Sequence, residues 1–370
     1  MHELFASISR SVVQSQSAGP VSLTILMTGL FIGCVACWAV AFGRMRIGRP
    51  LVEWERRAAV PWNLIDVACV VFLHLVAIVG GAALFGSVSG ISVEAMDGDT
   101  SLSAVQQITM MLVVEFAMLG AVAMSIGHLV FRARATSADM GLTTSKFQED
   151  FKIGVLAFLM LITPVLCMQL GLGTLFPDAG QHPFIELLKE QGDNFTLGMI
   201  FVVAVLLAPP IEEFLFRVVI QGWLERFMAV QEMNKNPIYG DVQEEQVHVE
   251  VGRGADEKKS ADRRVDEENP YAPPEVAGAL NALSSRGLVN ERRPPYGVQS
   301  WVPIILSSIL FALAHFGQGP APIPLFFLSL GLGFIYQRTH RIWPSVVAHM
   351  LVNGLAVVQL KFVLDSGIQV

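Results

Sequence analysis

Eight apolar stretches constrain the fold of this chain more than any other feature. A helix needs about 20 apolar residues to cross the hydrocarbon core of a bilayer. The stretches lie near residues 21–43, 63–87, 105–131, 153–176, 198–222, 301–316, 321–337 and 343–364. The sixth and seventh are short. Since backbone hydrogen bonds must be satisfied inside each lipid-embedded segment, the sequence predicts an all-α, polytopic membrane protein with about eight transmembrane helices.

Composition supports a membrane protein. The chain is 53% hydrophobic and only 15% charged, with a mean hydropathy of +0.53, whereas soluble domains are about a quarter charged. The net charge of −7 argues against a nucleic-acid partner. The N-terminus lacks the charged start, short apolar core and cleavage site of a signal peptide. The first apolar stretch is therefore expected to stay as an anchor.

Loop charges predict an orientation. The 44–62 and 132–152 loops are rich in Arg and Lys, whereas the 88–104 loop has neither and the 177–197 loop is mainly acidic. Positive charge is enriched in cytoplasmic loops. The pattern predicts a multi-pass protein of the cell (inner) membrane with cytoplasmic basic loops and both termini outside the cytoplasm.

The charged segment at 231–300 interrupts the membrane pattern. It holds more than a third of the charged residues, in mixed-sign blocks without apolar periodicity. Such a composition is typical of a disordered segment, here a cytoplasmic insertion, with a regulatory or partner-binding segment as the alternative. The predicted organisation is an N-terminal three-helix membrane region, a first core part, the insertion and a second core part, at 1–152, 153–230, 231–300 and 301–370.

The stretch "PPIEEFLFR" places charges inside an apolar run. Glu213 and Arg217 are four residues apart, so they share a helical face and can form an ion pair. That pairing leaves Glu212 without an obvious partner. Pro209 and Pro210 lack backbone N–H groups, so they predict a break or kink with both glutamates in the first turn beyond it.

Two later apolar stretches carry polar residues within residue pairs at helical spacing. Phe311 lies one turn before His315, where its ring can separate the imidazole from lipid, and His349 and Asn353 share one face of the last helix. Each pair alone is also typical of packing or helix-to-helix hydrogen bonding. Counting 1.5 Å per residue, however, brings these groups and Glu212 to similar depths, which predicts one shared intramembrane site.

Three other polar residues lie in the earlier stretches. His74, Glu115 and His128 have no polar neighbours at helical spacing. We interpret them as interhelical hydrogen-bonding groups or as residues near the ends of their helices.

The predicted cluster is suited to activating water. Glu212 in a partly dry pocket can act as a general base, with His315 holding the water and His349 and Asn353 donating to an oxyanion. A zinc version would use Glu212, His315 and His349 as ligands, since two histidines and a glutamate suit this metal. The chain has no H-E-x-x-H motif and asparagine is a poor zinc ligand, which favours the metal-free version slightly. Zinc is thus the one cofactor considered.

Three motifs, in order on separate hydrophobic segments, resemble those of one family. E-E-x-x-x-R spans Glu212 to Arg217, F-x-x-x-H spans Phe311 to His315, and H-x-x-x-N spans His349 to Asn353. The set is similar to that of the CPBP intramembrane proteases, which include type II CAAX prenyl endopeptidases and bacteriocin-immunity proteins (the ABI domain). The resemblance covers roughly residues 155–365.

The resemblance implies a helical core that cleaves peptide bonds near the cytoplasmic face. It assigns Glu212 and His315 to the water, His349 and Asn353 to the oxyanion, and Glu213 and Arg217 to structural support. The family has been described both as metal-dependent and as glutamate-based, so the metal stays open. The insertion and the first three helices depart from the usual core, which leaves the substrate open.

The leading hypothesis is an intramembrane endopeptidase acting on membrane-associated substrates, with CAAX-like proteins as one class. The alternative is a non-catalytic, peptide-binding immunity or scaffold protein of the same fold. A proton-coupled transporter would predict inverted repeats, and the sequence shows none. The expected partners are membrane lipid and a peptide or protein substrate, with no nucleic acid and an oligomeric state left open.

Overall fold

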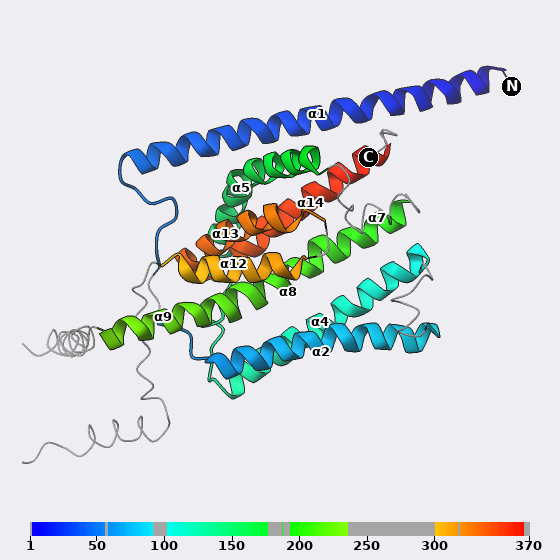
Figure 1. Ribbon diagram of the computed structural model, residues 1–370. Coiled ribbons are helices and arrows are strands. Elements are labelled where there is room, and N and C mark those ends of the chain that lie inside the picture. The colour runs from blue at the N-terminus through cyan, green and yellow to red at the C-terminus, as the bar shows by residue number, and fades with distance from the viewer. Residues whose placement is uncertain are drawn as a thin grey trace, which may run out of the picture. The chain divides into compact units, whose positions relative to one another are not determined.

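The computed structural model describes residues 2–55, 58–91, 102–176, 187, 193–235, 300–316 and 319–365. Regular structure in these ranges is helical, with no strand (Figure 1). The helices are α1 (His2–Arg46), α2 (Leu64–Ser89), α4 (Ala104–Phe131), α5 (Phe147–Leu175), α7 (Asn194–Phe201), η1 (Val202–Leu207), α8 (Ala208–Glu213), η2 (Phe214–Gln221), α9 (Gly222–Lys235), α12 (Val302–Ala314), α13 (Pro322–Thr339) and α14 (Trp343–Asp365). The predicted disorder of 231–300 concerns residues that lie almost wholly outside the described ranges.

The predicted class, an all-α multi-pass membrane protein, is confirmed. Helices occupy all eight predicted positions, and six helical segments of the described chain are long and apolar enough to cross a bilayer. These six are Thr24–Arg46, Leu64–Ser89, Ala104–Phe131, Phe147–Leu175, Asn194–Gln231 and Trp343–Phe362. The other two, α12 and α13, correspond to the stretches that the sequence marks as short.

The chain divides into two compact units. The larger comprises Met1–Glu55, Pro61–Leu224 and Ser300–Val370, and it contains all the residues of the predicted site. The smaller comprises Arg56–Val60 and Glu225–Gln299. Within the smaller unit, the Arg226 guanidinium donates to the Val60 carbonyl over 3.2 Å.

The predicted break at Pro209 and Pro210 does not occur. The helix runs from α7 to α9 without interruption, and the turn before the prolines widens to π geometry, in which the Ala208 N–H donates to the Val203 carbonyl. A wider turn adds a residue, which relieves the clash between a proline ring and the preceding carbonyls. Both glutamates therefore lie inside a continuous helix and not at a free N-terminus.

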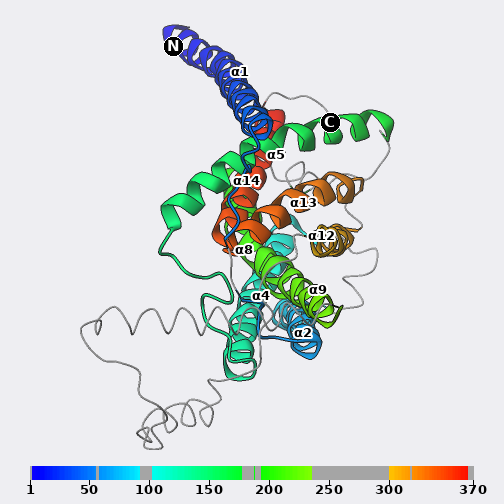
Figure 2. The same ribbon diagram turned by 90° about the vertical axis from the view of Figure 1, so that its left-hand side faces the viewer.

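The larger unit packs through close approaches between helices. One apolar cluster joins α1, α5, α13 and α14. α5 crosses α14 at Gly154, where a Cβ atom would lie only 2.7 Å from the Val347 side chain. Figure 2 shows α13 and α14 beside each other, and α12 next to α13. α12 contacts η2, and α14 contacts η1 and α8, so the segments that carry the second and third motifs pack against the helix that carries the first.

Charged loops meet at one end of the larger unit. The Arg341 guanidinium, between α13 and α14, binds Asp150 at the start of α5 over 2.6 Å and also binds Glu55. Lys146 binds Glu55 over 3.1 Å. Partial burial opposes ionisation of Glu55, but these two cations outweigh it and hold the pKa of its carboxyl below the ordinary value. The two basic loops thus lie on the same side as the α13–α14 turn.

Candidate active site

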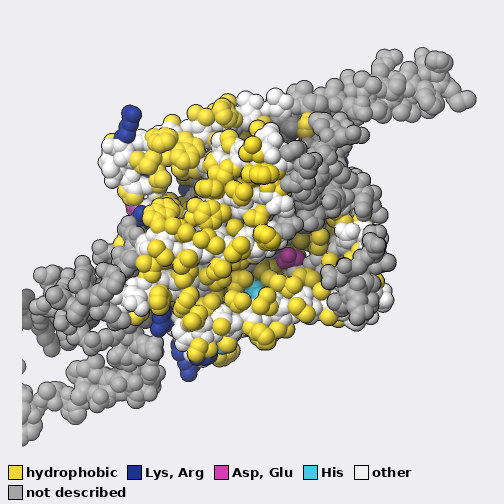
Figure 3. All heavy atoms as spheres, in the orientation of Figure 1, with side chains coloured by type: hydrophobic (Ala, Val, Ile, Leu, Met, Phe, Trp, Pro, Cys, Tyr) yellow, Lys and Arg dark blue, Asp and Glu magenta, His cyan; other side chains and the backbone are white. Residues whose placement is uncertain are grey.

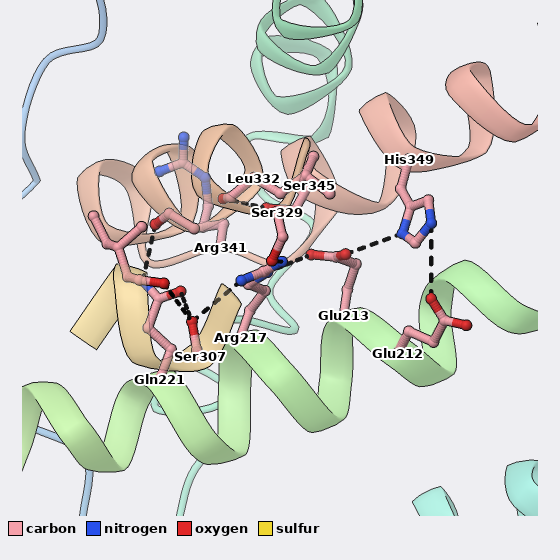
Figure 4. Close-up of polar contacts among 12 residues, drawn as sticks. Glu212, Glu213, Arg217, Gln221, Ser307, Ser329, Leu332, Arg341, Ser345 and His349 are labelled. Atoms are coloured by element: carbon pink, nitrogen blue, oxygen red, sulfur yellow. Dashed lines mark hydrogen bonds and ion pairs between the residues drawn. The ribbon is translucent and has the colours of Figure 1, made fainter. Parts of the chain in front are cut away.

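A buried ion pair forms the centre of the site. Glu213 and Arg217 are both fully buried, and the Arg217 Nε donates to Glu213 Oε2 over 3.1 Å across one helical turn, as their spacing predicts (Figure 4). The other guanidinium nitrogens reach two neighbouring helices. Nη1 donates to Ser307 Oγ on α12 over 3.3 Å, and Nη2 donates to Ser329 Oγ on α13 over 2.6 Å. One arginine therefore links three helices.

Gln221 extends this buried network. Its Nε2 donates to the Gly333 carbonyl over 2.8 Å, and its Oε1 accepts from Ser307 Oγ over 3.3 Å. A Cβ atom on Gly333 would lie 2.8 Å from Gln221 Oε1, so only glycine allows this approach. Sequence reasoning missed Gln221 and both serines. The available signal was Arg217 itself, since a buried guanidinium has five N–H donors that need acceptors.

His349 connects Glu213 with Glu212. Its Nδ1 lies 3.0 Å from Glu213 Oε1, and because a carboxylate accepts, Nδ1 carries the hydrogen (Figure 4). A neutral His349 then presents a lone pair at Nε2. That atom lies 3.7 Å from Glu212 Oε2.

His315 approaches Glu212 from α12 in the same manner. Its Nδ1 donates to the Phe311 carbonyl over 2.8 Å, which again leaves a lone pair at Nε2. The His315 Nε2 lies 3.8 Å from Glu212 Oε1. The Phe311 and His315 rings lie 4.8 Å apart, so the aromatic ring covers one side of the imidazole as predicted.

Glu212 differs from its neighbour Glu213 in exposure. The Glu212 side chain is 25% exposed, whereas that of Glu213 is completely buried. Acidic and histidine side-chain atoms reach the surface within an otherwise apolar face of the molecule (Figure 3). The 3.7 and 3.8 Å separations exceed hydrogen-bond length, and a water oxygen can contact the carboxylate and both rings. The structure thus brings together groups from all three motifs, and their catalytic role stays a prediction.

Asn353 does not pair with His349, although both lie on α14. Its Nδ2 donates to the backbone carbonyl of Ala204 in η1 over 2.8 Å. One of its two amide hydrogens is therefore bound to the backbone. The predicted donation from Asn353 to an oxyanion stays a prediction.

Glu115 is an acidic residue near the site that sequence reasoning misinterpreted. On α4, Ala104, Ile108 and Leu112 belong to a cluster that packs against α7, η1 and α14, and Glu115 continues the same helical stripe. Its charge repels that of Glu212. It lies well inside α4, and within the described residues it forms no hydrogen bond or ion pair. An unpaired intramembrane acid is itself the signal that could have identified it.

The site residues match a zinc site in chemical type but not in arrangement. Glu212, His315 and His349 are suitable ligands, and each histidine has an oxygen acceptor at Nδ1, as metal-binding histidines usually do. In the described ranges, however, no group of three or more His, Cys, Asp or Glu side chains is placed to hold a metal ion. Zinc stays the open alternative to the metal-free chemistry that the sequence favours slightly.

Comparison with known families supports a protease. The family model described as "Type II CAAX prenyl endopeptidase Rce1-like" matches residues 277–355. This segment is similar to that family. The match confirms the resemblance to CPBP family proteases. The Rce1-like segment contains His315, His349 and Asn353, whereas Glu212 precedes it. No curated protein and no solved structure matches the chain.

Proposed function

We propose that the protein is an intramembrane endopeptidase that hydrolyses peptide bonds of membrane-associated substrates, with CAAX-like proteins as one candidate class. The observation that carries the proposal is the position of Glu212 between the Nε2 atoms of His315 and His349, at 3.8 and 3.7 Å. Each ring is held at Nδ1 by a separate acceptor. The Rce1-like match supports a protease in general.

Glu212 acts as the general base. A water molecule donates one hydrogen to the Glu212 carboxylate and the other to the Nε2 lone pair of His315. Glu212 takes the proton as the water oxygen attacks the peptide carbonyl carbon. When the C–N bond breaks, the proton passes from Glu212 to the leaving amine nitrogen, so protons balance and Glu212 returns to its starting state.

His349 acts on the oxyanion. Because Glu213 fixes the hydrogen at Nδ1, the His349 Nε2 donates only when the ring carries a second proton, which it takes from solvent before the substrate binds and keeps through the reaction. The Glu213 carboxylate at the opposite side of the ring then offsets the positive charge of the imidazolium. Arg217 keeps Glu213 ionised and in place, so both residues support the site without touching the substrate.

We propose that the site lies near the cytoplasmic face of the inner or plasma membrane. His349 follows the start of α14 by six residues, or about 9 Å of helix, so it lies close to the end where the basic loops meet. Positive loops favour the cytoplasmic side. A peptide or protein substrate would enter from the lipid or from that surface.

The decisive experiment measures peptide cleavage by purified protein in detergent. Wild type is compared with Glu212→Gln and with a matched control, Glu149→Gln, which changes an exposed glutamate in the first turn of α5. We expect a peptide library to be cleaved by wild type and Glu149→Gln and not by Glu212→Gln. Cleavage that survives a chelator supports glutamate-based catalysis. Loss in chelator that added zinc restores supports a metal site.

The same experiment can overturn the proposal. A folded wild-type protein that cleaves no peptide, or cleavage that persists in Glu212→Gln, contradicts it. A folded, inactive protein that still binds peptides would favour the immunity or scaffold alternative.

A further inference from the structure

The carbonyl of Ala204 lacks a donor within its own helix. In a regular α-helix it would accept from the Ala208 N–H, but that N–H donates to Val203 in the π turn. In the π register the donor would be residue 209, which is proline and has no N–H. Both residues that could satisfy Ala204 along the helix are therefore unable to do so. A carbonyl oxygen that lacks a hydrogen-bond donor inside a membrane raises the free energy of the folded protein.

Asn353 provides the missing hydrogen bond from another helix. Its Nδ2 lies 2.8 Å from the Ala204 oxygen. The two helices lie close together here, since Val205 of η1 and Val357 of α14 belong to one apolar cluster, and a Cβ atom added to the adjacent Gly354 would lie 3.8 Å from Val205 Cγ1. The bond thus joins η1, one turn before the prolines, to α14.

This bond connects the two sides of the candidate site. Glu212 follows Ala204 by eight residues on the same continuous helix, and His349 precedes Asn353 by one turn on α14. The Asn353–Ala204 bond therefore fixes the helix that carries Glu212 relative to the helix that carries His349. The 3.7 Å separation between the Glu212 and His349 side chains depends on that relative position.

We propose that Asn353 is a positioning residue that replaces the donor removed by Pro209, and that the two residues act as a pair to hold Glu212 opposite His349. The inference rests on the proposed function of this site and gives Asn353 a role other than oxyanion binding. The two roles differ in one consequence. A positioning role depends on the residue at 209, whereas an oxyanion role does not.

The test is a rescue experiment on the full-length protein in detergent. Asn353→Ala should lower kcat by about 10- to 100-fold, the usual effect of removing a residue that orients a catalytic group, with KM nearly unchanged. Pro209→Ala restores an N–H that can donate to Ala204. The double variant Pro209→Ala/Asn353→Ala should therefore have a kcat within a few-fold of Pro209→Ala alone.

A neighbouring proline provides the matched control. In the π register, an N–H at residue 210 would face Val205 and not Ala204. Pro210→Ala/Asn353→Ala should remain as impaired as Asn353→Ala. If Asn353→Ala lowers kcat by the same factor in the wild-type and Pro209→Ala backgrounds, the proposal is overturned and the oxyanion role is favoured. An Asn353→Ala protein with wild-type kcat would overturn it as well.

Thermal unfolding in detergent tests the pair without relying on catalysis. Asn353→Ala should lower the unfolding midpoint in the wild-type background and leave it nearly unchanged in the Pro209→Ala background. If wild type cleaves no peptide, the proposed function fails while this coupling can still be measured. Equal shifts of the midpoint in both backgrounds would contradict the pairing of Asn353 with Pro209.

Discussion

The α2–α4 pair and the helices that carry the motifs use polar residues at different depths. α2 and α4 pack through small residues such as Gly81 and Ala117, and their ionic contacts lie at the helix ends, where Asp66 binds His128 over 3.0 Å and also binds Arg132. His128 thus makes the interhelical contact inferred from the sequence. In the motif-bearing helices, by contrast, the ion pair of Arg217 lies in the interior of the unit.

The two regions differ because the depth of a polar contact in the membrane decides what can replace a lost partner. At a helix end, water and headgroups can replace a lost partner, so a polar contact there mainly fixes the position of the helix. In the interior no such replacement exists, and each donor needs a protein acceptor. Each of the three guanidinium nitrogens of Arg217 therefore has a protein acceptor, while Glu212 stays partly exposed at the edge of the network.

The largest expected effect comes from removing the central cation. Arg217→Met leaves the Glu213 carboxylate buried without its arginine, which should destabilise the protein by about 3–5 kcal/mol and prevent most of it from folding. Arg132→Met is the control, because Arg132 is 46% exposed and the buried Asp66 keeps His128 and the Asn63 N–H as partners, so the loss should be smaller than for Arg217→Met. Denaturation in detergent measures both variants. Equal losses of unfolding free energy in the two variants would show that the depth of the arginine does not determine its contribution to stability.

A smaller effect is expected from forcing α2 and α4 apart. A Cβ atom on Gly81 would lie 3.0 Å from the backbone Cα of Val114, so Gly81→Val should destabilise the protein by about 1–3 kcal/mol. A Cβ atom on the adjacent Gly80 would meet no atom within 4 Å, which makes Gly80→Val the matched control. The kcat of the folded fraction should be unchanged in both. A large drop in kcat for Gly81→Val would mean that the pair shapes the site.

Glu115 is the place where the N-terminal helices should influence the reaction. Its carboxyl group interacts electrostatically with Glu212, and in the ionised form it favours substrates with a basic residue near the scissile bond. Glu115→Gln should lower the preference for a lysine peptide over its glutamine analogue by about fivefold, equivalent to roughly 1 kcal/mol. The ratio of kcat/KM for the two peptides measures this. An unchanged ratio would mean that Glu115 does not affect substrate preference and that the motif-bearing helices alone form the site.

The smallest effect concerns the charged loops. The folded-state pKa of Glu55 lies below its ordinary value of 4.5, so its contribution to stability is present above that pH and is lost as the pH falls through the folded-state pKa. Because Glu55 is 39% exposed, the contribution should be below about 1 kcal/mol. Unfolding midpoints between pH 6 and pH 3 measure it. Glu55→Gln should remove this part of the pH dependence, and an identical profile in the variant would contradict the prediction.

Local spacing predicted part of this site. Glu213 and Arg217 pair because residues four apart share a helical face, and the helix positions follow from apolar runs that only a bilayer explains. Both patterns depend on neighbours in the sequence. The assignment of the water-activating role to Glu212 rests on the same reasoning and awaits the cleavage experiment.

Long-range partners could not be predicted in the same way. Nothing in the sequence pairs Ser307 or Ser329 with Arg217, because these contacts depend on how helices cross. The π turn before Pro209 is one of several responses of a helix to proline, and it decides that Ala204 needs Asn353. Glu115 was misinterpreted because its neighbour Glu212 lies on a distant segment.

The bonds of Arg217 also bear on how the chain is assembled in the membrane. A helix centred on an arginine is inserted at a cost of about 2.5–3.5 kcal/mol. Glu213 on the same helix offsets part of that cost, and the remaining guanidinium N–H groups find acceptors when the helices bearing Ser307 and Ser329 pack in the correct register. Those helices are made later, beyond the charged insertion. An incompletely assembled chain would thus present a charged residue to lipid, and the step that hides the charge also brings the histidines to Glu212.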